Sequence, residues 1–293
     1  RALAGPYGAK SAGNVMTSNE SRGATTRLVL LIAALSACVS APERPRAMAA
    51  AASPQKPQPT TNSWPIRQVA NPPLPYRDID QNEAPPTALV SVIRSLGQSF
   101  KGKVGIAVYD PARGRMVHFK GTRLYPQQSV SKLWVALTAL DMADRGTLDL
   151  GETGTVRMRD LAVFHSPIRQ NVIARGSFSS SYAEFIRRAL TQSDNTANDT
   201  VLRRIGGPEQ VRQTLAKKGF ADIRFGPGER PMQSQIAGLE WRQPYALGDT
   251  FFEVRKTVPH DVRKAAFDAY VDDPVDGATP VAIAAAGRAD HKQ

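Results

Sequence analysis

Two short groups of residues in this sequence have the types and the spacing needed for acyl transfer through a serine. Ser129 and Lys132 are three positions apart, so on a helix they share one face, with the hydroxyl near the amine. The positive end of the helix dipole then lies at the hydroxyl. A buried amine that has lost its proton can accept the proton of a serine. These residues predict attack on an amide carbonyl, with lysine rather than histidine moving the proton.

The second group, Ser193–Asn195, follows about sixty residues later and reads Ser-Asp-Asn. Ser193 can relay a proton to a leaving nitrogen, and Asn195 can bind a substrate carbonyl or orient Lys132. The same residue types are also good N-caps for a helix, and Asp194 can be purely structural. The capping and the catalytic interpretations are compatible, so both remain open.

The surrounding pattern predicts the elements that would hold these groups. A helix over 129–145, ended by Gly146, is expected to be buried on most sides because apolar residues such as Leu133 and Leu140 leave little polar face. A helix over 182–190 should place Leu190 on its apolar side. The other expected elements are a helix around 89–96, a hairpin of 104–109 and 116–120, a helix over 196–205, and one from Pro208 to Gly219.

The amino-terminal part of the chain has the composition of processing sequence. Residues 1–15 precede the first methionine and are interpreted as an extension, and residues 16–38 resemble a signal peptide whose apolar run is far shorter than the ~20 residues of a spanning helix. The run ends in Leu-Ser-Ala-Cys, which resembles a bacterial lipobox with Cys38 as the lipidated residue. Ordinary cleavage near 47–52 is the alternative. The Pro- and Ala-rich segment 39–86 is predicted to be a tether before a domain over 87–293.

Composition narrows the kinds of site that the domain can hold. Cys38 is the only cysteine, so the domain has no disulfide, thiol nucleophile or cysteine metal site. The four histidines show no close pairing, and we expect neither a metal nor a cofactor. The formal charge of +12 is spread along the chain without an aromatic-basic stripe, which argues against nucleic acid and leaves weak attraction to anionic cell-wall polymer or a membrane surface.

On these residues the chain resembles the class A β-lactamases and their penicillin-binding relatives. Ser-x-x-Lys followed some sixty residues later by Ser-Asp-Asn is typical of that family, and the resemblance runs over about 88–229. It implies an α/β (α+β) fold, a helical lobe plus an antiparallel sheet. It also implies an acyl-enzyme mechanism with Ser129 as nucleophile, Lys132 as base or proton shuttle, Ser193 as proton relay and Asn195 as a substrate contact.

The resemblance also indicates a residue for hydrolysis of the acyl-enzyme. Continuing from Ser193 without gaps, the family's deacylating glutamate falls on Glu229, which would activate a water molecule. Glu240 is the competing candidate, and a surface carboxylate with no role is the third interpretation. Where the family carries an asparagine four residues on, this chain has Gln233, which is longer but can still hold a water molecule.

Two departures from the family change what the resemblance implies. The segment 234–275 is about thirty residues longer than the usual loop and rich in aromatic residues, so we expect an ordered insertion that can reshape the cleft. The family's third motif, Lys-Thr/Ser-Gly on a sheet strand, is absent, and residues 284–293 have no strand character. We therefore expect the carboxy-terminal sheet strands to be missing and the activity of this chain to be impaired.

The leading functional prediction is a β-lactam-hydrolysing serine enzyme that is exported to the periplasm, monomeric and attached to the membrane only through a lipid at Cys38. Its expected partners are a small-molecule β-lactam and peptidoglycan. A peptidoglycan DD-peptidase, which shares the acylation motifs, is one alternative. The other is a non-catalytic, lipid-anchored cell-wall binding protein.

Overall fold

The structure, a computed structural model, describes residues 85–287. The predicted extension (1–15), the signal peptide with Cys38 (16–38) and the tether (39–86) as far as residue 84 lie outside the described residues. Within the part of the chain that is described, no helix is both long and apolar enough to cross a membrane.

The described chain is mainly helical, with short paired strands between the helices. Its elements are, in chain order, α1 (Thr87–Ser99), β1 (Ile106–Asp110), β2 (Arg115–Phe119), β3 (Tyr125–Pro126), η1 (Gln128–Ser131), α2 (Lys132–Asp144), β4 (Thr153–Arg157), η2 (Met158–Asp160), α3 (Ile168–Arg175), β5 (Ser177–Ser181), α4 (Tyr182–Thr191), α5 (Asn195–Arg204), α6 (Pro208–Lys217), α7 (Glu229–Ile236), η3 (Gln243–Ala246), α8 (Thr250–Thr257), α9 (His260–Asp272), β6 (Gly277–Ala278) and α10 (Pro280–Ala286).

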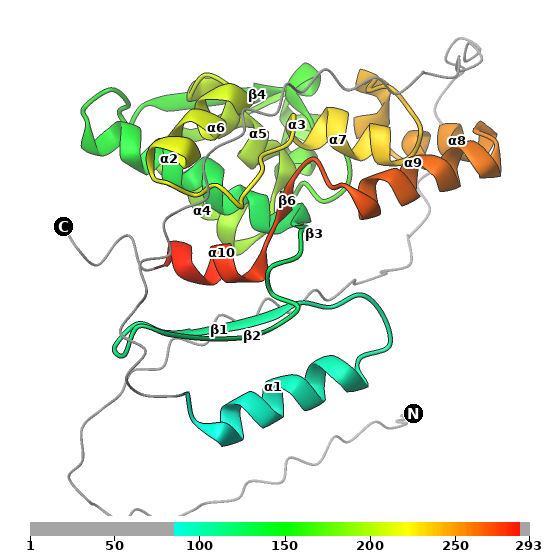
Figure 1. Cartoon of the computed structure of the whole chain (residues 1–293). Helices are drawn as coiled ribbons and strands as arrows, with labels where there is room; N and C mark the ends of the chain where they lie inside the picture. Colours follow the sequence, from blue (N-terminus) through cyan, green and yellow to red (C-terminus); the bar gives the residue numbers. More distant parts are fainter. Residues whose placement is uncertain (1–84, 288–293) are drawn as a thin grey trace, which may run out of the picture. The chain divides into compact units, whose positions relative to one another are not determined.

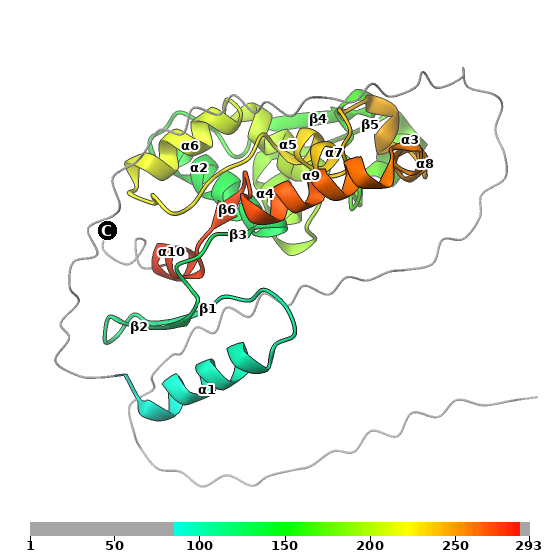
Figure 2. The ribbon, with the colours of Figure 1, turned by 45° about the vertical axis from the view of Figure 1, so that its right-hand side comes forward.

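The first helix and the hairpin that follows it confirm the prediction for this region. Strands β1 and β2 pair antiparallel, with Ile106 opposite Phe119. Helix α1 can approach β2 closely because Gly97 has no side chain; a Cβ at that position would lie 2.2 Å from the ring of Phe119. Figures 1 and 2 show the hairpin between α1 and α10, so that both of its faces are covered.

The segment predicted as one helix over 129–145 has two parts. Residues 128–131 form the 3₁₀ turn η1, and α2 begins only at Lys132. The helix ends as predicted at Gly146, whose φ of 70° reverses the chain. The prediction of burial on most sides is wrong for Leu133 and Leu140, which are 39% and 45% exposed.

The helices that follow α2 also agree with the prediction, whereas the strand pair β4–β5 was not predicted. Helices α4, α5 and α6 match the expected ranges within a residue or two, although Leu190 is 46% exposed rather than buried. Strands β4 and β5 pair antiparallel, with Thr153 opposite Ser181. Among the described residues the strands form three two-stranded antiparallel sheets, so the expected α+β fold is confirmed.

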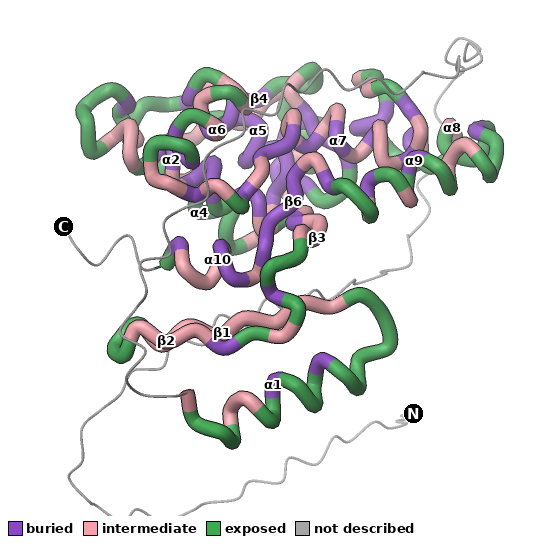
Figure 3. The backbone as a smooth tube through the Cα atoms, viewed as in Figure 1, coloured by how far each residue is buried: buried purple, intermediate pink, exposed green. Residues whose placement is uncertain are grey.

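Most buried apolar side chains form one core around α2, α4 and α5, where the buried residues are concentrated (Figure 3). Trp134 of α2, Phe185 of α4 and Val201 of α5 are almost wholly buried there. Each such side chain contributes about 1.5–3 kcal/mol to folding. The core therefore fixes the beginning of α2, which carries Lys132, against the beginning of α5, which follows the Ser-Asp-Asn segment.

The segment 234–275 is folded into the end of α7, η3, α8 and α9. Tyr245 and Phe251 are buried in a second, smaller apolar cluster, whereas Phe252 and Phe267 are 50% and 53% exposed. After α9 the chain returns as β6, which pairs with β3 immediately before η1. This pairing brings the carboxy-terminal end of α9 beside the turn that carries Ser129.

Candidate active site

The hydroxyl of Ser129 and the amine of Lys132 are in direct contact. Ser129 lies in η1 and Lys132 is the first residue of α2, so the two side chains are one helical turn apart. The Nζ of Lys132 donates to the Oγ of Ser129 at 2.9 Å. Lys132 is only 1% exposed, whereas Ser129 is exposed to solvent, so the amine reaches the hydroxyl from the protein interior.

Ser193 completes a triangle with these two groups. Its backbone has a φ of 54°, in the left-handed region, between α4 and α5. This turn directs the Oγ of Ser193 into the site, where it donates to the Oγ of Ser129 at 3.0 Å and accepts from the Nζ of Lys132 at 3.4 Å. A proton can therefore pass among all three groups without moving the backbone.

The capping interpretation of the Ser-Asp-Asn segment holds for Asp194. Its buried carboxylate accepts the backbone N–H groups of Thr196 and Ala197 at 2.9 and 3.0 Å and so caps α5. It also accepts from the backbone of Ile168 and the hydroxyl of Ser166, at 3.0 and 3.2 Å. Asp194 is thus a structural residue that holds Ser193 and Asn195 on either side of it.

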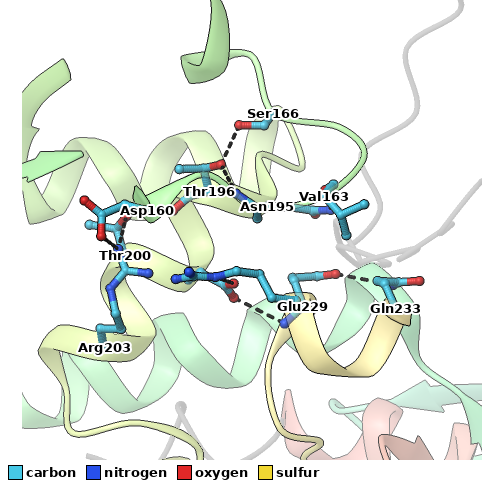
Figure 4. A network of polar contacts seen from close by, with 12 residues as sticks. Asp160, Val163, Ser166, Asn195, Thr196, Thr200, Arg203, Glu229 and Gln233 are labelled. Carbon is cyan, nitrogen blue, oxygen red and sulfur yellow. Dashed lines mark hydrogen bonds and ion pairs between the residues drawn. The ribbon is translucent and has the colours of Figure 1, made fainter. Parts of the chain in front are cut away.

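Asn195 follows Asp194 as the first residue of α5, and its side chain is directed at a neighbouring loop. Its Nδ2 donates to the carbonyl of Val163 at 3.0 Å, as Figure 4 shows. Its backbone N–H donates to the carbonyl of His165, also at 3.0 Å. These two bonds tie the loop over 161–166 to the start of α5, beside Ser193.

Glu229, the first residue of α7, forms a buried ion pair with Lys132. Its Oε1 lies 3.0 Å from the Nζ of Lys132, and the two side chains are 4% and 1% exposed. The carboxylate of Asp199 accepts the backbone N–H of Glu229 at 3.3 Å and pairs with Arg230 at 3.4 Å. Burial and the neighbouring Glu229 carboxylate raise the pKa of Asp199 to about 6.

Gln233 lies one turn further along α7, on the same side as Glu229 (Figure 4). Its Nε2 donates to the Oε2 of Glu229 at 3.3 Å and to the Oε1 of Gln128 at 2.9 Å. The rival candidate Glu240 is exposed to solvent beyond the end of α7. The structure therefore brings Ser129, Lys132, Ser193, Glu229 and Gln233 together, with Asn195 at the edge of the group.

Sequence reasoning missed four residues that hold this group in place: Gln127, Gln128, Tyr270 and Asp276. Gln127 is buried, accepts the indole N–H of Trp134, and donates to the carbonyl of Asp276, each at 2.5 Å. The Oδ2 of Asp276 accepts the backbone N–H of Gln128 at 2.8 Å, and burial raises the pKa of Asp276. The sequence feature that could have indicated these residues is the pair of glutamines directly before Ser129, because polar residues beside a reactive side chain often position it.

The site holds one amine, hydroxyls, amides and carboxylates. Among residues 85–287, no three His, Cys, Asp or Glu side chains gather closely enough to hold a metal ion. A small cavity lined in part by Asn198, Glu229 and Asp276 has room for about one water molecule. This set of groups suits proton transfer around a serine nucleophile.

The sequence of this chain is similar to those of known beta-lactamases. A sequence model of the beta-lactamase enzyme family matches residues 88–265. The chain is 28% identical over 152 residues to an imipenem-hydrolyzing beta-lactamase of Enterobacter cloacae, a match that covers 52% of this chain and 51% of that protein. It is also 25% identical over 210 residues to the beta-lactamase ROB-1 of Haemophilus influenzae, covering 66% of this chain and 65% of that protein.

Among solved structures, an ancestral class A beta-lactamase superposes with a TM-score of 0.45 at 25% identity, covering 63% of this chain and 71% of its own. The matched part spans about half the length of the first of these curated relatives.

Proposed function

Since the chain belongs to the beta-lactamase enzyme family, we propose that it hydrolyses β-lactams through an acyl-enzyme on Ser129, in the manner of the class A enzymes. The observation that carries this proposal is the set of contacts that joins Ser129, Lys132, Ser193 and Glu229 in one group, in which Lys132 and Glu229 are buried and Ser129 is exposed. The beta-lactamase relatives are matched over about half their length, so the activity of this chain is itself part of the proposal.

Acylation begins with the proton of Ser129. A proton passed from the ammonium of Lys132 to the carboxylate of Glu229, 3.0 Å away, leaves a neutral amine that can accept the serine proton at 2.9 Å. The serine oxygen then bonds to the lactam carbonyl carbon, and the ring C–N bond breaks. Ser193 passes a proton from Lys132 to the leaving nitrogen, so that the ring-opened acyl group remains on Ser129.

The oxyanion formed during attack needs hydrogen-bond donors. The backbone amide of Ser129, at the amino-terminal end of α2, is proposed as one of them, where the helix dipole favours negative charge. Asn195 is proposed to contact the substrate amide with the polar atoms that its bond to Val163 leaves available. Both assignments follow from the position of these groups next to the serine pair.

Deacylation distinguishes the hydrolase from a peptidase. Once the proton that Glu229 took from Lys132 has returned to that amine, we assign Glu229 as the base that takes a proton from a water molecule. The water oxygen attacks the ester carbonyl, the bond to the oxygen of Ser129 breaks, and Lys132 gives that oxygen its proton. Gln233 donates to Glu229 and is proposed to orient this water molecule. A buried carboxylate within reach of the nucleophile's own lysine favours the hydrolase over the DD-peptidase alternative, since a peptidase needs no such base against a β-lactam.

The proposal is tested by mixing the full-length protein with a chromogenic cephalosporin and following both absorbance and intact mass. We expect ring opening, and a transient mass increase equal to the substrate on Ser129. Ser129→Ala should show neither. Glu229→Gln should acylate more slowly, because Lys132 loses the carboxylate that accepts its proton, and should retain the adduct that it forms at least about a hundredfold longer. Glu240→Gln is the matched control, because that carboxylate is exposed. Absence of any adduct on the unaltered protein at millimolar substrate would show that the proposal is wrong.

We further propose export to the periplasm with a lipid on Cys38 as the only membrane attachment. The support is the sequence pattern of residues 16–38 alone. Expression in a Gram-negative host, fractionation and intact mass measurement test it. A diacylglyceryl mass on Cys38 is expected, and Cys38→Ser should move the protein from the membrane fraction to the soluble periplasmic fraction. An unmodified chain cleaved near 47–52 would indicate ordinary signal cleavage instead.

A further inference from the structure

One side chain of the inserted helix α9 takes part in the hydrogen bonds of the candidate active site. Tyr270 lies near the carboxy-terminal end of α9 and is 9% exposed. The Nε2 of Gln128 donates to its hydroxyl oxygen at 2.5 Å. Gln128 is the residue directly before Ser129, so a helix 142 positions along the chain contacts the nucleophile's turn.

From Gln128 the hydrogen bonds continue to the proposed deacylation base. The Oε1 of Gln128 accepts from the Nε2 of Gln233 at 2.9 Å, and this same nitrogen donates to the Oε2 of Glu229 at 3.3 Å. The other oxygen of Glu229 pairs with Lys132. One continuous series of contacts therefore runs from Tyr270 through two amides to the carboxylate.

Tyr270 determines which end of the Gln128 side-chain amide donates a hydrogen bond and which end accepts one. A phenol oxygen can accept the N–H of Gln128. Burial, together with the neighbouring carboxylate of Asp276, raises the pKa of Tyr270 and keeps the phenol neutral. With its nitrogen held at Tyr270, the side-chain amide of Gln128 must present its oxygen to Gln233. Rotating that amide by a half-turn would bring two N–H₂ groups against each other and remove the acceptor of Gln233.

The backbone of Gln128 also needs support. Its φ of 49° lies in the left-handed region, which costs about 1 kcal/mol or more for a residue other than glycine. Asp276 holds the backbone N–H of Gln128 at 2.8 Å, and Tyr270 holds its side chain. Both supports come from the segment at the end of the insertion, after the chain has left α7.

We propose that Tyr270 is a positioning residue for hydrolysis of the acyl-enzyme: it fixes the side-chain amide of Gln128, which holds Gln233 on Glu229. This inference rests on the proposed function and deepens it. The contacts of Ser129 with Lys132 and Ser193 do not pass through Tyr270, so its removal should act on deacylation far more than on acylation. The insertion is thereby part of the catalytic apparatus rather than a surface addition.

The test is a comparison of the two half-reactions in Tyr270→Phe, which removes one oxygen atom. The protein is mixed with a chromogenic cephalosporin, and the reaction is quenched at times from milliseconds to minutes. The intact mass of the protein is then measured by mass spectrometry. We expect acylation within about threefold of the unaltered protein and deacylation slowed at least about tenfold, with the adduct accumulating. Phe267→Leu is the matched control, since Phe267 lies on the same helix with its ring 53% exposed, and it should change neither rate.

Two further variants separate positioning from loss of folding. Gln128→Asn keeps an amide and tolerates the left-handed backbone, but it is too short to reach both partners, so it should reproduce the deacylation defect. Adding Tyr270→Phe to the Glu229→Gln variant should slow deacylation no further. Tyr270 acts through the carboxylate of Glu229, and that variant has already lost this carboxylate. Equal deacylation by Tyr270→Phe and the unaltered protein would overturn the inference. Failure of every variant and of the unaltered protein to form an adduct would instead overturn the proposed function on which it rests.

Discussion

The Nζ of Lys132 lies 3.0 Å from the Oε1 of Glu229, and neither side chain is more than 4% exposed. Each residue is the first of its helix, Lys132 of α2 and Glu229 of α7. The helix dipole favours an anion at such a position and disfavours a cation. Glu229 is therefore well placed in its own helix, and its carboxylate also offsets the unfavourable position of the lysine.

This ion pair predicts a specific pattern of stability changes. Lys132→Met should lower the free energy of unfolding by about 3–5 kcal/mol, because it leaves the carboxylate of Glu229 buried without its partner, and Glu229→Gln should lower it because it leaves the ammonium of Lys132 unpaired. Lys132→Met combined with Glu229→Gln should recover much of that loss, since the double variant buries no charge. Urea unfolding at neutral pH measures both. A double variant as unstable as the sum of the two single changes would contradict this account.

Asp194 should be the most stability-sensitive residue of the Ser-Asp-Asn segment. Its buried carboxylate accepts four hydrogen bonds, two from the start of α5 and two from the region of 166–168. Asp194→Ala removes the cap and leaves buried donors unsatisfied, so we expect a loss of about 2–4 kcal/mol. Because Ser193 precedes it directly, acylation should slow as well.

The chain supplies a matched control for the Asp194 experiment. Asp249 occupies the N-cap position of α8, but its side chain makes no capping hydrogen bond. Asp249→Ala should therefore change the unfolding free energy by less than about 0.5 kcal/mol. Similar losses from the two substitutions, measured by urea unfolding, would show that the bonds of Asp194 are not what stabilises α5.

The predicted part of the site is the part encoded by local spacing. Ser129 and Lys132 meet because three residues in a helical or 3₁₀ turn always bring side chains together, and Asp194 caps α5 because it stands directly before it. The helices around them follow from apolar periodicity and from Gly and Pro boundaries. The pair β4–β5 was missed because the strand Ser177–Ser181 is serine-rich and has no apolar alternation.

Glu229 and Gln233 were predicted from the resemblance to the class A β-lactamases rather than from local spacing, and their supporting residues Gln128 and Tyr270 were not predicted. Gln128 meets Tyr270 across 142 positions and Gln233 across 105, and Glu229 meets Lys132 only once α7 has docked on α2. No local pattern encodes such contacts, since they depend on how the chain returns after α9 through β6, which pairs with β3. The left-handed backbone conformation of Gln128 could not be predicted either, because glutamine has no special preference for that conformation.

Ser193 can be tested independently of folding. Ser193→Ala removes the proposed proton relay, and we expect acylation to slow about a hundredfold, as is typical for loss of one acid–base group. Ser193→Gly removes the same hydroxyl but relieves the strain of the backbone φ of 54°. The two variants should acylate equally slowly, while the glycine variant unfolds at the same or a higher temperature. Acylation at the unaltered rate in either variant would exclude the relay.

Asp199 predicts how stability changes with pH. Its pKa is about 6 in the folded protein because burial and Glu229 disfavour the anion, against about 3.9 in an unfolded chain. Between these values the folded state binds more protons, so this group's contribution to stability is fully present below about pH 4 and is lost as the pH rises through 6. The expected loss between about pH 4 and pH 7 is about 2 kcal/mol.

Asp199→Asn isolates this contribution from the other titrating groups. The asparagine can still accept the backbone N–H of Glu229, which Asp199 accepts at 3.3 Å, but it cannot titrate. The difference in unfolding free energy, unaltered protein minus variant, should therefore fall as the pH rises from about 4 to 7, whatever the slope that Asp276 and the exposed carboxylates give to both proteins. Urea unfolding at half-unit pH steps measures it. A difference that stays constant, or that grows with pH, would mean that Asp199 is charged throughout and that Arg230, 3.4 Å away, outweighs the cost of its burial.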